Sequence, residues 1–299
     1  MSVRRAIVRS FTVAAAATWC AAPLAAQGPD WKAVEAAMGR APVVQAGDVH
    51  RFNFPRSDLK VTVAGIPIVP AFALGGWVAF APMGRDALVM GDLVLTEDEI
   101  SPVITALQAG GVEQTAIHHH LLRESPRVYY THIHAHGDPV KIATTVRAAL
   151  AKTGVPAAAA GGPAPSAASI GIDSAGVARA LGAAGRVAGG TLQFGIPRAE
   201  AIRDGGMEVP AVMGLGTAIN FQPIGGGKAI ITGDFVMLGS EVNAVIKALR
   251  DNGIEAVSLH NHLLADEPRL FFMHFWANDD AVKLARGLRA ALDKTNSRR

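Results

Sequence analysis

Six of the chain's ten histidines lie between residues 115 and 138, in the stretch "TAIHHHLLRESPRVYYTHIHAHGD". Neutral imidazoles are common ligands of first-row transition metals, and three that converge leave a coordination position for water or substrate. The alternative is that these side chains only decorate a surface strand and bind water. The six are His118, His119, His120, His132, His134 and His136.

An internal repeat covers most of the chain. The segment "HHHLLRESPRVYYTHIHAHGDPVKIATTVRAALAKT", from His118, aligns at a constant shift of 142 residues with "HNHLLADEPRLFFMHFWANDDAVKLARGLRAALDKT", from His260. Upstream, Gly91-Asp92 aligns with Gly233-Asp234 at the same shift. Such a repeat predicts two copies of one folding unit. We expect them at residues 30–152 and 170–296, joined by an Ala, Pro and Gly-rich linker at 153–169.

The repeat shows which histidines both copies keep. His119 aligns with Asn261, and His134 aligns with Trp276, so these two are not kept. Alternate residues of a strand share a face, so His118 and His120 point together and His119 points away. A hairpin register with residue 118 opposite residue 130 would bring His132 diagonally within reach of His118. The predicted ligands of a divalent transition metal, zinc first, are His118, His120, His132, His260, His262 and His274.

Charged residues near the histidines are candidates for supporting roles. Glu124, with Glu267 or Asp266 in the second copy, could be a ligand, a partner of a ligand or a general base on bound water. Asp92 and Asp234 could supply carboxylates, although an Asp near a strand end is often a turn residue. Further accessory candidates are His136 and His134, together with Arg127 and Arg269, which either bind an anionic ligand or are exposed cations.

Three other patterns have simpler interpretations. His50 is expected to be a packing or surface residue. "IGGGK", residues 224–228, lacks the spacing of a phosphate loop and predicts a hairpin turn. "HHHLLRE" satisfies the HxH-x3-E part of a cupin motif, but the helix patterns of both copies argue against an all-β barrel.

The pattern of elements predicts an α+β fold. In each copy an Asp N-cap precedes a short helix, at residues 31–38 and 174–181. Thr96 and Glu99 form a capping box for a helix that Gly110 ends, and a last helix runs from Pro139 to about residue 152. Strands are expected around 112–118 and 127–135. We expect an antiparallel sheet with helices on one face in each domain, and the two domains paired about a pseudo-twofold axis, with a cleft between them for a ligand.

The amino terminus has the layout of a secretory signal peptide. Three arginines precede an Ala-rich apolar run, with cleavage expected near Ala26 and the mature chain in the periplasm or outside the cell. Removing residues 1–26 removes those three arginines and no acid, so the net charge of +3 falls to 0 and gives no argument for nucleic acid. No later stretch of the sequence predicts a transmembrane segment. Cys20, the only cysteine, lies inside the leader and does not follow small residues, so we expect no lipid attachment.

The motifs "VMGDLVLTEDEISPV", "HHHLLRESPRVYYTHIHAHGDPVK" and "LHNHLLADEPRLFFMHFWANDDAVKLARGLRAALD" resemble the domain-of-unknown-function 1259 family, also called the LppY/LpqO-like conserved lipoproteins. The resemblance covers both copies and implies an exported bacterial envelope protein. It implies no reaction and no catalytic residues. The chain departs from the lipoprotein members because it lacks a good lipobox, and its His119 and His134 replace the expected Asn and Gly.

Three functions are compatible with this sequence. The first is a metal-dependent enzyme, expected to be a hydrolase, and the second is a metal-handling protein without catalysis. The third is a metal-free module that binds a small molecule or a cell-envelope ligand.

Overall fold

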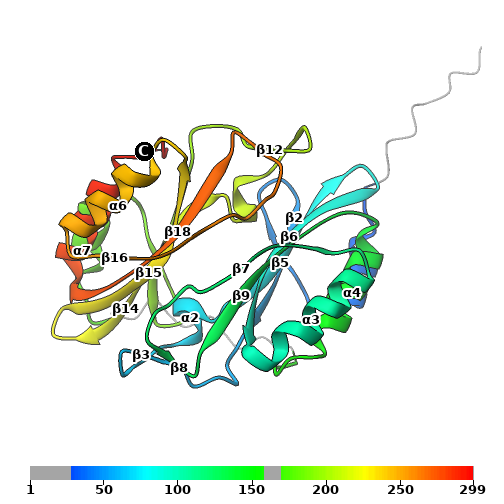
Figure 1. Cartoon of the computed structure of the whole chain (residues 1–299), viewed down its shortest axis with the longest axis horizontal. Coiled ribbons are helices and arrows are strands. Elements are labelled where there is room, and N and C mark those ends of the chain that lie inside the picture. The colour runs from blue at the N-terminus through cyan, green and yellow to red at the C-terminus, as the bar shows by residue number, and fades with distance from the viewer. Residues whose placement is uncertain (1–27, 158–169, 299) are drawn as a thin grey trace, which may run out of the picture.

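The computed structural model describes residues 28–157 and 170–298 (Figure 1). The expected signal peptide, its cleavage point near Ala26 and Cys20 lie outside the described residues, as does most of the expected linker, at 158–169. Within the described residues no helix is both long enough and apolar enough to cross a membrane.

The elements of the first copy fall within residues 28–157. Its helices are α1 (Trp31–Met38), α2 (Pro70–Ala73), α3 (Glu97–Ala109) and α4 (Pro139–Leu150). Its strands are β1 (Val43–Gln45), β2 (Val49–Pro55), β3 (Thr62–Val63), β4 (Ile66–Pro67), β5 (Gly75–Met83), β6 (Asp86–Thr96), β7 (Glu113–His118), β8 (Glu124–Ser125) and β9 (Val128–Gly137).

The second copy repeats this order within residues 170–298. Its helices are α5 (Ser174–Leu181), the short 3-10 helix η1 (Ala211–Met213), α6 (Val242–Asp251) and α7 (Ala281–Leu292). Its strands are β10 (Arg186–Ala188), β11 (Thr191–Pro197), β12 (Arg203–Asp204), β13 (Met207–Glu208), β14 (Gly216–Gly225), β15 (Lys228–Leu238), β16 (Glu255–His260), β17 (Asp266–Glu267) and β18 (Leu270–Asp280).

The helices begin where the capping residues predict. Asp30 accepts a hydrogen bond from the backbone N–H of Ala33 at 3.1 Å, and Glu99 accepts one from the backbone N–H of Thr96 at 2.9 Å. Both bonds satisfy N–H groups that a first helical turn leaves without partners. The glycine run 225–227 forms the tight turn between β14 and β15, so the hairpin prediction for "IGGGK" is confirmed.

Each copy is built on a six-stranded antiparallel sheet. The strand order is β1-β2-β5-β6-β9-β7 in the first copy and β10-β11-β14-β15-β18-β16 in the second. Two small three-stranded sheets, β4-β3-β8 and β13-β12-β17, complete the copies. β9 and β18 lie next to the edge in their sheets, and β7 and β16 are the edge strands beside them.

The long helices cover the outer face of each large sheet, as Figure 1 shows, whereas the short helices α2 and η1 lie between the sheets. Val34, Leu107 and Val146, from α1, α3 and α4, join one apolar core with the first sheet, and α5, α6 and α7 form the equivalent core with the second. The inner faces of the sheets face each other through two further apolar clusters that contain residues of both copies. The predicted α+β class and the pairing of two tandem domains are confirmed, and the all-β cupin alternative is wrong.

Strand β9 shows why the histidines lie between the copies. Ile133 and Ala135 point into the core beneath the helices, whereas Tyr130 belongs to a cluster shared with the second copy. Because side chains alternate across a strand, His132 shares the inner face with Tyr130. The same alternation in β18 places Met273 and Phe275 beneath the helices and His274 on the inner face.

A buried arginine stabilises the same corner of each copy. Arg56 donates to the carboxylates of Asp58 and Glu99 and to the carbonyl of Val94, and its side chain is 1% exposed. Arg198 repeats this with Glu200, Glu241 and the carbonyl of Val236. Buried charges need such partners because an unpaired one is strongly unfavourable. The arrangement joins the end of β2 or β11 to the start of α3 or α6.

The pKa of Glu99 predicts an acid-dependent contribution to stability. Burial alone would raise this pKa, but hydrogen bonds from Arg56 and from the N–H groups of Thr96 and Gly154 lower it below the ordinary value. A lowered folded-state pKa stabilises above the unfolded pKa of about 4.3, and the stabilisation is lost as pH falls through the folded value. We expect urea unfolding to show a smaller loss of stability between about pH 5 and pH 3 in Glu99→Gln than in the wild type. Equal losses in the two proteins would contradict this assignment.

Candidate metal centre

The histidines of each copy come from one strand pair and one loop. His118, at the end of β7, lies opposite Tyr130 of β9, and His260, at the end of β16, lies opposite Phe272 of β18. This is the register that, from the sequence, would bring His132 within reach of His118, whereas a register shifted by one residue would have sent His132 to the other face. In each copy the second histidine of the His-x-His pair lies just past the edge strand, and the third lies on the neighbouring strand.

The two sets of three histidines meet between the sheets. The rings of His118 and His260 stack with centroids 3.8 Å apart, and the Nε2 atoms of His118 and His274 are 3.2 Å apart. The pairs that symmetry relates have similar spacings, with ring centroids 3.7 Å apart for His120 and His274 and 3.9 Å for His132 and His262. A pseudo-twofold axis therefore passes between His118 and His260, and the six rings form one cluster, called the histidine cluster below.

Ring nitrogens in this cluster come close enough to share an ion. Three overlapping sets of three histidines each place one nitrogen per ring within 4.8 Å of the others. Only one of these sets comes from a single copy, and the other two combine copies. The sets are His118, His260 and His274; His118, His120 and His132; and His132, His260 and His262.

Two aspartates lie against opposite ends of the histidine cluster. Oδ2 of Asp92 is 3.4 Å from Nε2 of His120, and Oδ2 of Asp234 is 3.0 Å from Nε2 of His262. Asp92 lies within β6, paired with His132, and Asp234 lies within β15, paired with His274. Both are mid-strand residues rather than turn residues. The geometry therefore adds one carboxylate from each copy to the six imidazoles.

The glycine before each aspartate allows close packing beneath the cluster. A Cβ on Gly91 would lie 2.7 Å from the carbonyl oxygen of Trp77, and one on Gly233 would lie 2.0 Å from that of Ala218. Real side chains do not tolerate such contacts with backbone. The repeated Gly-Asp pair therefore combines a close approach of strands with a carboxylate directed at the histidines.

Backbone carbonyls hold three of the rings in place. Nδ1 of His132 lies 3.3 Å from the carbonyl of Gly91, Nδ1 of His274 lies 2.7 Å from that of Gly233, and Nδ1 of His262 lies 3.0 Å from that of Gly214. Donation from Nδ1 leaves Nε2 as the atom with a free lone pair. Buried atoms without a hydrogen-bond partner include Nε2 of His132, Nε2 of His262 and both ring nitrogens of His260.

Burial disfavours the charged form of several imidazoles in the cluster. Desolvation, followed by the nearby histidines, lowers the pKa of His118 to about 2 and lowers the pKa of His120, His132 and His260 in the same way. Burial raises the pKa of Asp92, and the charge of Asp234 raises it further. Neutral imidazoles are the form that binds a metal, so the cluster requires little proton loss from histidine before an ion enters.

Aromatic rings close both ends of the cluster. Tyr130 stacks on His120 with centroids 3.4 Å apart, and Phe272 stacks on His262 at 3.5 Å. The Tyr130 hydroxyl donates to the carbonyl of Ala73 at 2.9 Å. Sequence reasoning did not place these two aromatic residues at the site. The sequence did contain a signal for them: Tyr130 aligns with Phe272 in the repeat, and each lies two residues before a predicted ligand.

The predicted bases lie elsewhere. The Glu124 carboxylate is buried, 3.5 Å from Nδ1 of His119 and 3.8 Å from Nε of Arg127. Glu267 is exposed on β17, whereas the neighbouring Asp266 is buried and accepts hydrogen bonds from Arg269 and from the N–H of Leu270. In the described structure neither Glu124 nor Glu267 forms an ion pair or hydrogen bond with the histidine cluster. A catalytic role for them stays a prediction.

The remaining accessory candidates are peripheral. Arg127 and Arg269 are exposed, and His136 is exposed near the end of β9. His134 bridges the copies, with Nε2 2.8 Å from Oδ2 of Asp204. His50 stacks on Trp31 with centroids 3.9 Å apart, which agrees with its expected packing role.

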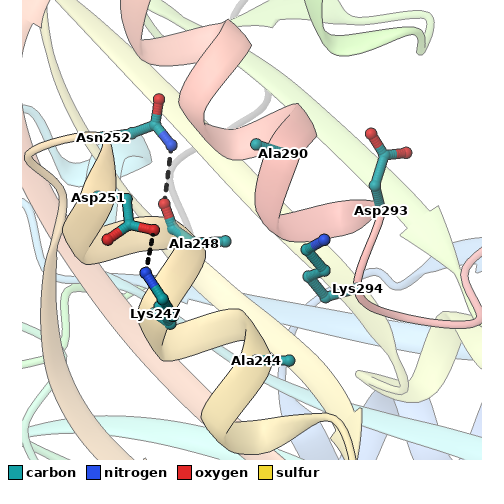
Figure 2. Close-up of a pocket in the computed structure, with 8 residues that line it drawn as sticks. All are labelled: Ala244, Lys247, Ala248, Asp251, Asn252, Ala290, Asp293 and Lys294. Atoms are coloured by element: carbon teal, nitrogen blue, oxygen red, sulfur yellow. Dashed lines mark hydrogen bonds and ion pairs between the residues drawn. The ribbon is translucent and has the colours of Figure 1, made fainter.

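A surface hollow of about 540 Å³ lies on the outer helical layer, between α6 and α7 (Figure 2). The side chains that line it include Lys247, Asp251, Asp293 and Lys294, and Lys247 pairs with Asp251 at 2.6 Å. The hollow is on the opposite side of the second sheet from the histidine cluster. It brings together none of the predicted site residues.

Comparisons with known proteins identify a family but no activity. The family described as Domain of Unknown Function (DUF1259) matches residues 32–152 and again residues 175–294. A comparison with curated proteins finds no match.

Solved structures give only distant likenesses. A trimeric bacterial microcompartment shell protein, PduB, is 15% identical, with 85% of this chain and 91% of that chain covered and a TM-score of 0.21. EtuB from Clostridium kluyveri is 10% identical, with coverages of 84% and 90% and a TM-score of 0.20. A double ringed trimeric shell protein from the RMM microcompartment is 12% identical, with coverages of 71% and 83% and a TM-score of 0.19. Scores at this level carry no argument about this chain.

Proposed function

The chain belongs to the family described as Domain of Unknown Function (DUF1259), and for this member we propose that both copies together bind a divalent transition metal ion in the histidine cluster. The observation that carries the proposal is the convergence of six imidazoles from both copies, with a carboxylate beside each end and with buried ring nitrogens that have no hydrogen-bond partner. Such atoms are unfavourable in a folded protein unless something else satisfies them. A metal ion would do so.

The chemistry of the ligands favours zinc, with copper, nickel and cobalt as competitors. Imidazole nitrogen suits all four ions, and a carboxylate completes many zinc sites. The backbone carbonyls of Gly91, Gly214 and Gly233 are the kind of partner that orients metal-bound histidines. When bound, such an ion can polarise water or a carbonyl group.

Binding without turnover is the form of the proposal that these contacts support. Asp92 and Asp234 are carboxylates that lie beside the histidine cluster, against His120 and His262. Tyr130 and Phe272 cover the rings beside them. Hydrolysis is an additional hypothesis, and it requires that Glu124 or Glu267 approach the bound ion.

Elemental analysis of the purified chain tests the proposal. The chain should retain zinc or another first-row metal after gel filtration, or take up added Zn²⁺ in calorimetry. A chain that purifies without metal and shows no uptake of Zn²⁺, Cu²⁺, Ni²⁺ or Co²⁺ would refute it. A pull-down on cell-wall material in the presence of a chelator tests the metal-free alternative.

Metal should stabilise the folded chain, because an ion that binds only the native state shifts the unfolding equilibrium. At 100 times the dissociation constant this stabilisation is about 2.7 kcal/mol. For a chain of this size that corresponds to an increase in Tm of about 5–10 °C. Differential scanning calorimetry with Zn²⁺ and with a chelator measures the difference, and identical Tm values would contradict it.

We further propose export of this chain to the periplasm or the cell exterior, supported by the arginines and the apolar run of its first 26 residues. Mass spectrometry of the protein from a periplasmic or culture fraction tests the proposal. A mature amino terminus near Gln27 is expected. An intact Met1 in a cytoplasmic fraction would contradict it.

A further inference from the structure

We propose that the histidine cluster holds one divalent ion per chain, placed between the copies, and not one ion in each copy. This inference rests on the proposed metal binding and deepens it. A repeated sequence with a complete set of three histidines in each copy would suggest two equivalent ions. The arrangement of the side chains argues for one.

The overlap of the ligand sets is the first reason. Each of the three sets of converging histidines shares one histidine with each of the others, through His118, His132 or His260. Two ions in two of these sets would therefore compete for one imidazole. The set His260, His262 and His274, which a separate second-copy site would need, is not among the converging sets of the described residues.

The position of the shared rings is the second reason. His118 and His260 occupy equivalent positions and stack across the pseudo-twofold axis with an angle of 19° between their planes. Nε2 of His118 is 3.2 Å from Nε2 of His274, a ring of the other copy. Two nitrogens bound to one zinc at about 2.0–2.1 Å in tetrahedral geometry lie at a similar separation. These two nitrogens, placed at the separation that one ion requires, belong to different copies.

Charge balance is the third reason. A bound cation favours the ionised form of both carboxyl groups, so Asp92 and Asp234 would then supply one negative charge each, which a single divalent ion neutralises. A second divalent ion would leave a net charge of +2 among buried neutral rings, where charge is poorly solvated. Arg51, which stacks on the Trp77 ring at 4.1 Å and acts electrostatically on Asp92, would add to that excess.

The test measures stoichiometry and affinity for Zn²⁺ by isothermal titration calorimetry and elemental analysis. It uses the metal-free full chain and a matched pair of variants, Asp92→Asn and Asp234→Asn. These substitutions preserve side-chain shape and remove one carboxylate from one copy. Circular dichroism of the metal-free variants checks that both fold. The number of ions bound by the wild type decides between one and two ions per chain without the variants.

One ion per wild-type chain is expected, with the affinity for that same ion reduced about 10-fold or more in each variant. Two ions per chain, with one retained at full affinity in each variant, would overturn the inference and leave the proposed metal binding intact. If Asp92→Asn or Asp234→Asn binds one ion with full affinity, the ion is not held by both copies and the inference is overturned. No ion in the wild type would refute the proposed function and this inference with it.

Discussion

Replacement of His274 by alanine is expected to abolish tight metal binding by the whole chain, although the first copy keeps its own three histidines. His274 lies 3% exposed on the inner face of β18, and its Nε2 is 3.2 Å from Nε2 of His118. Loss of a direct ligand should exceed the 10–100-fold cost typical of a lost outer partner, so we expect an affinity for Zn²⁺ reduced by more than about 100-fold. Isothermal titration calorimetry measures it.

His50→Gln is the matched control for this prediction. His50 is also a buried strand histidine, but it stacks on Trp31 and interacts with Asp48 at the edge of the first sheet. Its replacement should leave zinc affinity within about two-fold of the wild type. Retention of a full-affinity ion by His274→Ala would show that the first copy binds metal alone, against the shared centre.

Replacement of Arg198 by methionine is expected to produce the largest loss of stability. The guanidinium is 1% exposed and bonds to two carboxylates and a backbone carbonyl. Without it, Glu200 and Glu241 lose their shared cation, and the carbonyl of Val236 loses its side-chain donor. Removal of one partner from a buried ion pair costs about 3–5 kcal/mol. Urea denaturation of the metal-free proteins measures the change.

Two further variants control this experiment. Arg56→Met removes the equivalent group of the first copy, so it should destabilise by a similar amount. Arg286→Met removes an exposed arginine from α7, and a surface change of this kind is expected to stay within about 0.5 kcal/mol of the wild type. A loss below about 1 kcal/mol in Arg198→Met would show that the buried ion pairs of Arg198 contribute little to the free energy of unfolding.

Much of each domain could be predicted because local rules act on neighbouring residues. The Asp30 and Thr96 caps and the turn at 225–227 follow from patterns within one copy, whereas the register of residue 118 opposite residue 130 was one of two that the sequence allowed. The repeat then separated His118, His120 and His132 from the other three histidines. These predictions rest on strand alternation and helix capping, which are local rules that tertiary packing leaves unchanged in this fold.

The sharing of the site could not be predicted, because no pattern within a copy states which sheet faces meet. A cleft was expected between the domains, whereas the structure fills that space with apolar side chains and the histidine cluster. Asp92 was weighed as a turn residue because its position along β6 was unknown. The constant shift of 142 residues also aligns Arg56 with Arg198, but no pattern in the sequence shows that they are buried; their burial and their partners Glu99 and Glu241 emerge only when distant segments pack together.

The most direct test of the shared centre is an anomalous difference map from a crystal grown with Zn²⁺ and measured at the zinc absorption edge. The account predicts a peak bounded by imidazoles of both copies, within coordination distance of His118 and His274, or of His260 and His132. A zinc-loaded crystal with no peak in the histidine cluster, or with separate peaks that each contact histidines of one copy alone, would contradict it.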